Sequence, residues 1–527
     1  MKGERATSAK SESPFITAHH RVFTYCLSLL SKVTLVTPKS RGGTDDRTTY
    51  ITLTPAQGKV ADSVYRGYRN WLQRFIKLHG AFLSRQDINL LRGNEIEIKS
   101  YILMRRWGQD VSPKMYRTFY RKELNDLLKQ QIKKCKLATT CQRSPNNARK
   151  RRLQAGASLT IGVEEEHQIV SVPDWGLKQN VDHILSVARS SQFSREVYKS
   201  QIEAKTPVCE DISRVRKELI RVRKHLKDIL PQNLAVLSAG THPFSTWNVQ
   251  QANKTARTDL FMHDMQESVR RLVTFGYHVH VGIENRDLAV QVINAARSFL
   301  PFLLAISTSS PFWEGHDTGL FSRRSTVFSA LPRTGIPPTF DSFSDYEDYW
   351  DLLAKTNSFD SMGSRDPTKI WWDIRLHPKL PTIEFRICDA CSFIDDAVCI
   401  AALCQAITAK LIKMLHSGIE LSVPAKHIIE ENKWRAIRYG SRARFIDPQS
   451  KNEVTARFLA FQLLDFVEDV LPELGSEREI RHILNIIENG SSALKQILMY
   501  RRLNGSVQNR LMKVTEWLAS EFLSNGR

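Results

Sequence analysis

The sequence predicts an α/β protein of the α+β kind, with one domain from residue 158 to about residue 520. Charge marks the boundary: residues 1–157 hold 31 lysines and arginines against 11 acidic residues, or +20, whereas the rest hold 45 against 44, or +1. The hydrophobic pattern beyond residue 158 predicts the fold class. Strand-like segments, with β-branched residues and period-two alternation, are interspersed with amphipathic helical segments. A chain of 527 residues that is 42% hydrophobic can also bury a large core.

Residues 1–157 are predicted to form a basic, partly disordered extension. Residues 1–55 are polar and rich in Ser and Thr, and helices are expected from about residue 56 to residue 136. The segment 112–136 is either an ordinary amphipathic helix with a solvated basic face or a binding site for an acidic partner. NNARKRRLQAGAS (146–158) has the composition of a linker. An upstream start-codon assignment would also explain such an extension.

Cysteine usage and hydropathy predict a cytoplasmic protein without a membrane span. Eight cysteines in a chain of this length do not make a disulfide framework, and no run approaches the roughly 18–20 apolar residues of a membrane helix. RVFTYCLSLLSKVTLV (21–36) is the nearest candidate for a targeting segment, but Lys32 interrupts it and no small-residue cleavage site follows.

Four cysteines, Cys388, Cys391, Cys399 and Cys404, have the number but not the setting of zinc ligands. The last two lie in DDAVCIAALCQAITAKLIKML (395–415), whose apolar residues recur at helical spacing behind an Asp cap. Small buried cysteines in a helix core are therefore the preferred interpretation.

The expected elements beyond residue 158 follow from these periodicities. Strands are predicted at 159–170, 233–240, 277–283 and 381–389. Helices are predicted at 213–230 and 285–307, and a helical section from about residue 453 onward.

The segment LTIGVEEEHQIV (159–170) carries three consecutive carboxylates inside an apolar strand. Successive side chains of a strand alternate between faces, so Glu164 and Glu166 share one face and Glu165 points to the other. Two like charges on one face repel unless a cation lies between them, and oxygen ligands of this kind suit magnesium or manganese. The alternative is a solvent-facing edge strand with acidic side chains.

Three further segments place charged or imidazole side chains at alternate strand positions. His278 and His280 share a face of YHVHVGI, and Glu384 and Arg386 share a face of PTIEFRICD. Each pair alone could be a core histidine pair or a surface ion pair. Taken together with Glu203 of SQIEAK and Arg375 of WWDIRLHP, they predict a basin with cation ligands on one wall and arginines on another. Such a basin suits a nucleoside triphosphate with two divalent ions.

Nine blocks occur in an order that resembles the type 2 glutamate-cysteine ligase family, also called YbdK-type carboxylate-amine ligases. They are IGVEEEHQIV, SQIEAKTPVC, SAGTHPF, FGYHVHVGI, STSSPFWEGHDTG, SRRSTVFSALP, WWDIRLHP, TIEFRICD and RAIRYGSRARFIDP. They span roughly residues 159–448, and nothing in residues 1–157 matches the family pattern. The resemblance implies a glutamine-synthetase-like catalytic fold, in which helices cover the back of a curved, mainly antiparallel sheet.

The resemblance also implies roles for individual residues. Glu164 and Glu166 would match the strand that holds the two metal ions. Glu203 would be a further metal ligand, and His278 with Glu384 would hold the second ion. His280, Arg375 and Arg386 would lie near the nucleotide phosphates, with the two arginines as the catalytic pair. Substrate-side residues would be Thr241, His242, Arg324, Arg438 and Tyr439. Cys209 and Cys388 are expected to be structural, because the implied reaction needs no enzyme nucleophile.

The activity implied is an ATP-dependent ligation of a carboxylate, first of all glutamate, to an amine such as cysteine. ATP and Mg²⁺ (or Mn²⁺) are the expected cofactors, and a second copy of the chain in a homodimer is an expected partner. Two alternatives stay open at this point. One is an inactive ligase-like protein that binds nucleic acid or another polyanion through residues 1–157, and the other is a metal-dependent hydrolase, which would need no phosphate-facing arginines.

Overall fold

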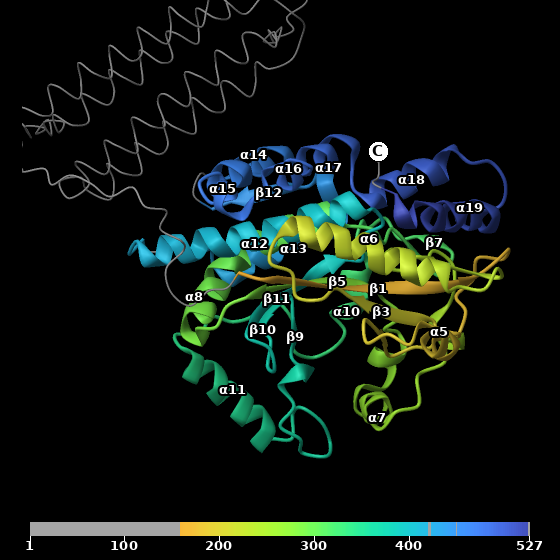
Figure 1. Cartoon of the computed structure of the whole chain (residues 1–527), viewed down its shortest axis with the longest axis horizontal. Helices are drawn as coiled ribbons and strands as arrows, with labels where there is room; N and C mark the ends of the chain where they lie inside the picture. Colours follow the sequence, from red (N-terminus) through yellow and green to blue (C-terminus); the bar gives the residue numbers. More distant parts are fainter. Residues whose placement is uncertain (1–158, 420–422, 449–450, 525–527) are drawn as a thin grey trace, which may run out of the picture. The chain divides into compact units, whose positions relative to one another are not determined.

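The computed structural model describes residues 159–419, 423–448 and 451–524, drawn in colour in Figure 1. The predictions for residues 1–157, including the helices from residue 56 and the linker, lie outside the described residues.

A seven-stranded sheet is the centre of the described domain, with strand order β10-β11-β5-β1-β3-β2 and β4 paired to the far part of β1. All of its pairings are antiparallel, which confirms the predicted mainly antiparallel sheet. The strands are β1 (Ile161–Ser171), β2 (Phe193–Arg195), β3 (Gln201–Lys205), β4 (Leu234–Leu237), β5 (Gly276–Gly282), β10 (Ile374–Leu376) and β11 (Thr382–Asp389). Each of the four predicted strands is present within a few residues of its expected bounds.

The long strand β1 shows why one face of the sheet is apolar and the other polar. Ile161, Val163 and Glu165 are buried, whereas Gly162, Glu164 and Glu166 between them are partly exposed. This period of two follows from the pleat of the strand, as the sequence predicts. The first set faces the helices, and the second set faces the opening of the domain.

Helices cover the apolar face of the sheet and form its core. The long helix α12 (Ile394–His416) is almost wholly buried, and it packs with α6 (Ile212–Asp228), α8 (Arg286–Ala296) and α9 (Leu300–Ser307). Figure 1 shows α6, α12 and α13 (Lys426–Tyr439) above the sheet, with the C-terminal helices as an outer layer. That layer contains α14 (Ala456–Val467), α15 (Leu471–Leu474), α16 (Glu477–Ile480), α17 (Ile483–Asn489), α18 (Ser492–Arg502) and α19 (Val507–Ser520).

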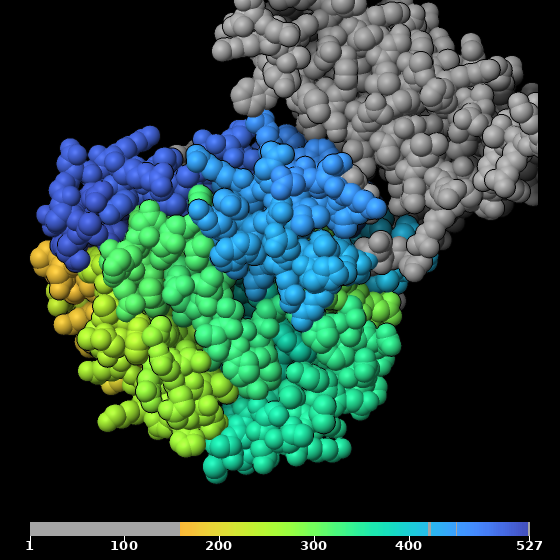
Figure 2. All heavy atoms as spheres, turned by 180° about the vertical axis from the view of Figure 1, so that it is seen from behind, coloured from red at the N-terminus to blue at the C-terminus, as the bar shows by residue number. Residues whose placement is uncertain are grey.

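The opposite side of the sheet carries shorter elements, among them α7 and α11 in Figure 1. They include α5 (Val181–Ala188), α7 (Ala256–Arg270), α10 (Arg323–Phe328), α11 (Phe343–Lys355) and the small strands β8 (Thr334–Gly335) and β9 (Trp371–Trp372). The paired strands β6 (Phe312–Trp313) and β7 (His316–Asp317) lie near the C-terminal helices, and Figure 1 shows β7 above β1. Seen from behind, the blue C-terminal segments cover one side of the domain, and the yellow-green and green segments of about 250–370 cover the other (Figure 2).

Three details differ from the sequence predictions. The helix predicted at 285–307 is interrupted by a 3-10 turn at Arg297–Phe299, because Pro301 has no N–H to continue the α-helical bonding. Helix α12 begins after Phe393 without a side-chain cap, and its Asp residues lie in the first turn, where they favour the helix dipole. The C-terminal section opens with the pair β12 (Arg444–Asp447) and β13 (Asn452–Thr455) before the helices begin.

Two helical stretches in the described residues are long and apolar enough to cross a membrane by length and composition alone. They are Arg286–Ser307 and Ile394–His416, and 78% of each apolar window is buried inside the domain. Both therefore fit the core helices of a folded domain.

Candidate active site

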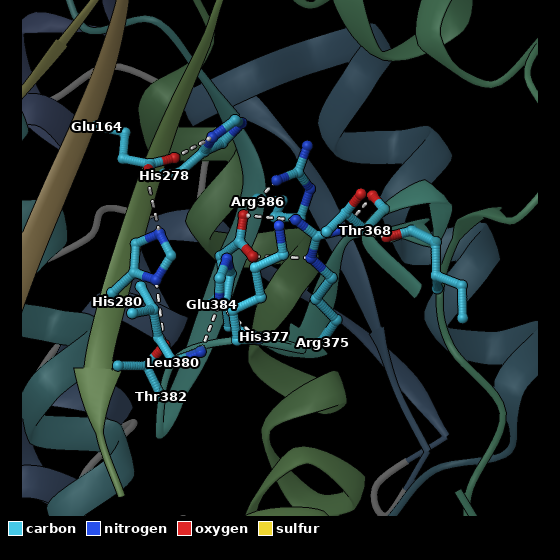
Figure 3. Close-up of polar contacts among 12 residues, drawn as sticks. Glu164, His278, His280, Thr368, Arg375, His377, Leu380, Thr382, Glu384 and Arg386 are labelled. Atoms are coloured by element: carbon cyan, nitrogen blue, oxygen red, sulfur yellow. Dashed lines mark hydrogen bonds and ion pairs between the residues drawn. The ribbon is translucent and has the colours of Figure 1, made fainter. Parts of the chain in front are cut away.

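The polar face of the sheet forms the floor of a cavity of about 470 Å³. Strands β1, β3, β5, β10 and β11 each contribute charged or imidazole side chains to its lining. The contributed residues are Glu164, Glu166, Glu203, Lys205, His278, Arg375, Glu384 and Arg386. Figure 3 shows the histidines of β5 and the charged residues of β10 and β11 pointing toward one another. The predicted basin is therefore present as a physical cavity.

One end of the cavity is acidic. Glu166 of β1 lies directly opposite Glu203 of β3 in the strand register, so two carboxylates are cross-strand neighbours. Glu196, in the loop after β2, joins them, and burial together with Glu203, Glu166 and Glu164 raises the pKa of Glu196 well above its ordinary value. Like charges placed this closely destabilise a sheet unless something positive neutralises them.

Glu164 lines the cavity together with His278, and buried His280 lies on its other side, outside the lining. Nδ1 of His278 lies 3.4 Å and Nε2 of His280 lies 3.6 Å from the Glu164 carboxylate. Burial would raise the pKa of Glu164, but the hydrogen bonds and charges of the two histidines hold it well below its ordinary value. Burial alone would lower the pKa of His280, yet Glu164 and Glu384 raise it. The Glu164 carboxylate is thus ionised in the folded protein.

The other end of the cavity contains a carboxylate clamped by two guanidinium groups. Glu384 is 1% exposed, and Arg375 reaches it with Nε at 2.7 Å and Nη2 at 3.3 Å. Arg386 donates to the same carboxylate from two residues along β11. Burial would raise the pKa of Glu384, but the two arginines hold it well below its usual range. Both guanidinium groups line the cavity, as a phosphate site requires, and Nη1 of Arg375 also donates to the carbonyl groups of Thr368 and Ile370.

A bulge in β11 positions Arg386. The pairing of β11 with β5 shifts by one residue between Phe385 and Cys388, so the carbonyl groups of Arg386 and Ile387 leave the ladder. Arg324 of α10 takes up both, with Nη2 3.3 Å from the Arg386 carbonyl and Nη1 3.3 Å from the Ile387 carbonyl. Of the five predicted substrate-side residues, Arg324 is the one that lines the cavity.

The other four predicted substrate-side residues make contacts elsewhere in the described domain. Thr241 donates to the Phe312 carbonyl, and His242 contacts the Trp175 carbonyl through Nε2 at 2.9 Å. Burial lowers the pKa of His242 to about 4, so it is a neutral structural side chain. Arg438 donates to the Gly319 carbonyl and lies over the ring of Tyr439, which is 47% exposed. Sequence blocks of this kind do not distinguish residues that line a cavity from residues that support its walls.

Glu165 points to the opposite face, as alternation predicts, and it meets a partner there. Nη2 and Nε of Arg223 in α6 lie 2.5 and 2.9 Å from the two carboxylate oxygens of Glu165. The Glu165 side chain is 2% exposed and that of Arg223 is 0% exposed. Burial would raise the pKa of Glu165, but the Arg223 charge lowers it. The pair ties β1 to α6, so Glu165 has a structural role.

The donor set fits a divalent cation. Within the described residues, the group that could hold a metal ion is Glu164, His280 and Glu384, whose ligand atoms lie within 4.8 Å of one another. Nε2 of His280 and Nε2 of His278 are buried and lack hydrogen-bond partners. The grouping differs from the sequence-based assignment, because His280 rather than His278 lies with Glu384. The register explains this, since His280 is directly opposite Glu384 and His278 is directly opposite Glu164.

Several cavity residues were not singled out from the sequence. His377 follows Arg375 by two positions and Lys205 follows Glu203 by two, so strand alternation could have identified both. Burial lowers the pKa of His377 to about 4. Glu196 lies in a loop, where no periodicity points to it. A wall of Phe261, Leu272, Phe328, Leu331 and Trp371 makes the remaining side of the cavity apolar.

The cysteines of the described residues are buried free thiols. Burial raises the pKa of Cys209 to about 11 and that of Cys388 to about 12, so neither is a nucleophile at neutral pH. Cys388, Cys391, Cys399 and Cys404 belong to the main hydrophobic core, which agrees with the predicted core interpretation.

Comparison with known proteins supports the family resemblance found in the sequence. A sequence model described as "Glutamate-cysteine ligase family 2 (GCS2)" matches residues 160–514. A relative from Roseiflexus sp. (strain RS-1), named "Putative glutamate-cysteine ligase 2", is 40% identical over 365 residues, which are 68% of this chain and 95% of the relative. A relative of the same name from Solibacter usitatus (strain Ellin6076) is 40% identical over 69% of this chain and 93% of its own. Among solved structures, a bifunctional glutathione synthetase from Pasteurella multocida superposes with a TM-score of 0.52 at 14% identity, over 69% of this chain and 52% of that one, which indicates a shared fold.

Proposed function

The chain belongs to glutamate-cysteine ligase family 2, and from that premise we propose that it joins a carboxylate to an amine with ATP as the energy source. Glutamate is the first candidate for the acid and cysteine for the amine. The proposed products are an amide, ADP and phosphate. The membership makes the chain a carbon–nitrogen ligase of the glutamate-cysteine ligase type.

One observation carries the proposal: the polar face of the sheet orders its charges from acidic to basic across five neighbouring strands, β3, β1, β5, β11 and β10. Glu166 and Glu203 lie at one end, Glu164 lies in the centre, and the pair Arg375 and Arg386 lies at the other. A triphosphate and a substrate carboxylate are both anions, so negative charge is concentrated where they meet. Positive groups beside that point stabilise it.

The residues present fit a divalent cation, and we propose two positions for it. Glu164, His280 and Glu384 would hold one ion, and Glu166 with Glu203 would form the second position, with His278 between the two. When bound, Mg²⁺ or Mn²⁺ would supply positive charge to the phosphate oxygens.

The proposed reaction has two steps. The γ-phosphoryl group passes from ATP to a substrate carboxylate oxygen, which gives an acyl phosphate and ADP. The amine then attacks the acyl carbon, and phosphate leaves with one of the original carboxylate oxygens. Arg375 and Arg386, whose guanidinium groups line the cavity, would orient the phosphoryl group and stabilise its charge. Glu384 would fix the direction of both guanidinium groups.

An assay of product release tests the proposal. The protein would be incubated with ATP and MgCl₂, with glutamate and cysteine together, with each alone, and with neither. We expect ADP and phosphate to form at the full rate only when both amino acids are present, and glutamyl-cysteine to appear in equal amount. Hydrolysis of ATP without either amino acid, or no ADP in any mixture including wider sets of acids and amines, would contradict the proposal.

We also propose that the catalytic unit begins near residue 158, because the family match starts at residue 160. A shortened chain that begins at Gln154 should keep the ligase activity of the full chain. Any binding of the full chain to RNA, DNA or anionic lipid should weaken steeply with salt and be lost in the shortened chain, because the +20 charge lies in residues 1–157. A shortened chain that is folded but inactive would show that residues 1–157 complete the site.

A further inference from the structure

A lysine lies among the carboxylates of the acidic end. Lys205 is the last residue of β3 and lies directly opposite Glu164 in the register of β1 and β3. Its Nζ is 2.5 Å from Oε1 of Glu203 and 3.7 Å from Oε1 of Glu164. Both carboxylates belong to the proposed cation ligands, so one ammonium group contacts two of them at once.

The burial of its partners separates this contact from an ordinary surface ion pair. The Lys205 side chain is 40% exposed, but Glu203 is only 9% exposed and Glu164 only 20%. Exposed pairs contribute little because water screens both charges. Here the carboxylates are inside the cavity, and Lys205 extends into the cavity to meet them.

Three of the cavity carboxylates contact a lysine or an arginine. Glu164 and Glu203 contact Lys205, and Glu384 contacts two arginines. Glu166 has His278 at 4.0 Å and a backbone N–H donor, and no lysine or arginine pairs with it among the described ion pairs. The acidic end therefore already contains one fixed positive charge, located between Glu203 and Glu164.

We propose that Lys205 is a built-in counter-cation of the basin, which competes with a divalent ion for Glu203 and Glu164. An ammonium group and a divalent ion cannot both lie within contact distance of the same oxygen without strong repulsion. The oxygens of Glu203 and Glu164 that Lys205 contacts are consequently less available to a divalent ion than they would be without this lysine. This inference rests on the proposed function for the identity of the ligands, but it concerns the binding of the ion and not the ligase reaction.

Titration with Mn²⁺, followed by the electron paramagnetic resonance signal of the free ion, tests the proposal on the full chain without ATP or amino acids. Lys205→Met should bind one more Mn²⁺, or bind the weaker Mn²⁺ at least roughly tenfold more tightly, because a charge in contact with the ligands is gone. Adding Glu203→Gln to this variant should reverse the gain. Lys205→Arg keeps the positive charge and should bind as the wild type does.

Lys379→Met is the matched control, since Lys379 lines the same cavity and forms no ion pair among the described residues. It removes the same charge without contacting the carboxylates, so the Mn²⁺ affinity should change by less than threefold. Unchanged binding by Lys205→Met, or an equal gain in Lys379→Met, would overturn the proposal. If Lys205→Met does not fold, Lys205→Gln takes its place with the same expected gain. The two proposals can fail separately. If Lys205→Met gains Mn²⁺ affinity but the wild-type chain ligates no substrates, the proposed function is refuted and the role of Lys205 is retained.

Discussion

The buried pair of Glu165 and Arg223 gives the sharpest prediction about stability. Alternation alone suggests that Glu165→Gln is mild, because the side chain points away from the basin. The structure predicts otherwise. Among the described ion pairs, Glu165 is the carboxylate bound to the fully buried guanidinium of Arg223, whose other donors reach the carbonyl groups of Cys391, Ser392 and Phe522. Glutamine would keep the shape and leave Arg223 without a counter-charge.

The size of the effect follows from burial. Removing one partner of a buried ion pair typically costs about 3–5 kcal/mol, because the remaining charge is uncompensated. The three carbonyl acceptors keep Arg223 hydrogen-bonded, so Glu165→Gln should lie at the lower end, at about 3 kcal/mol. With a urea dependence of about 3 kcal/mol per M, the unfolding midpoint should fall by about 1 M. Glu164→Gln, on the same strand but partly exposed to the cavity, should lower the free energy of unfolding by clearly less than Glu165→Gln does.

Urea unfolding followed by circular dichroism and tryptophan fluorescence measures both variants. The double replacement Glu165→Leu with Arg223→Met should recover most of the lost stability, because apolar groups of similar volume replace the pair. Equal midpoints for Glu165→Gln and Glu164→Gln would refute the reasoning. So would a double variant that is less stable than Glu165→Gln alone.

Three further predictions concern the site and its surroundings. Glu166→Gln should lower turnover at least roughly a hundredfold with little change in melting temperature, because a cation ligand is lost where charge develops; near-normal turnover would exclude Glu166 as a ligand. Gly276→Ala should lower turnover at least roughly tenfold. The new Cβ would lie 2.5 Å from Nη2 of Arg324 and 2.8 Å from Nε2 of His278, so both side chains would have to move. A kcat equal to that of the wild type would show that neither side chain needs its present position. Thermal stability should fall as the pH decreases from about 6.5 toward 4. Burial lowers the pKa of His167 and of His242 from 6.5 to about 4, so between these pH values only the unfolded chain binds their protons. A melting temperature independent of pH over this range would contradict the neutral state of both histidines.

Local periodicity explains what the sequence could predict. The face of Glu164 and Glu166, the opposite face of Glu165 and the shared face of His278 and His280 all follow from the pleat of a strand. The predicted strands and the long core helix α12 follow from the same kind of local pattern. The placement of Arg375 and Arg386 beside a carboxylate needed only the order of two adjacent strands.

The remaining features depend on contacts between distant parts of the chain. Arg223 meets Glu165 across 58 positions in the sequence, so no local pattern pairs them. The pairing of His280 with Glu384 is set by the register of β5 against β11, which the sequence left open. Thr241 and His242 belong to a sequence block that the resemblance assigned to the substrate. In the structure both form hydrogen bonds with backbone carbonyl groups, so they stabilise the surroundings of the cavity and do not line it.

The path of the carboxylate oxygen tests the central claim most directly. Glutamate labelled with ¹⁸O in its side-chain carboxylate would be ligated to cysteine, and the released phosphate would be examined by mass spectrometry. An acyl phosphate passes one carboxylate oxygen to phosphorus, so each phosphate should carry one ¹⁸O and the nucleotide product should be ADP. Label in AMP, with pyrophosphate as the other product, would require an acyl adenylate and would contradict the mechanism derived from the arginines and carboxylates of this cavity.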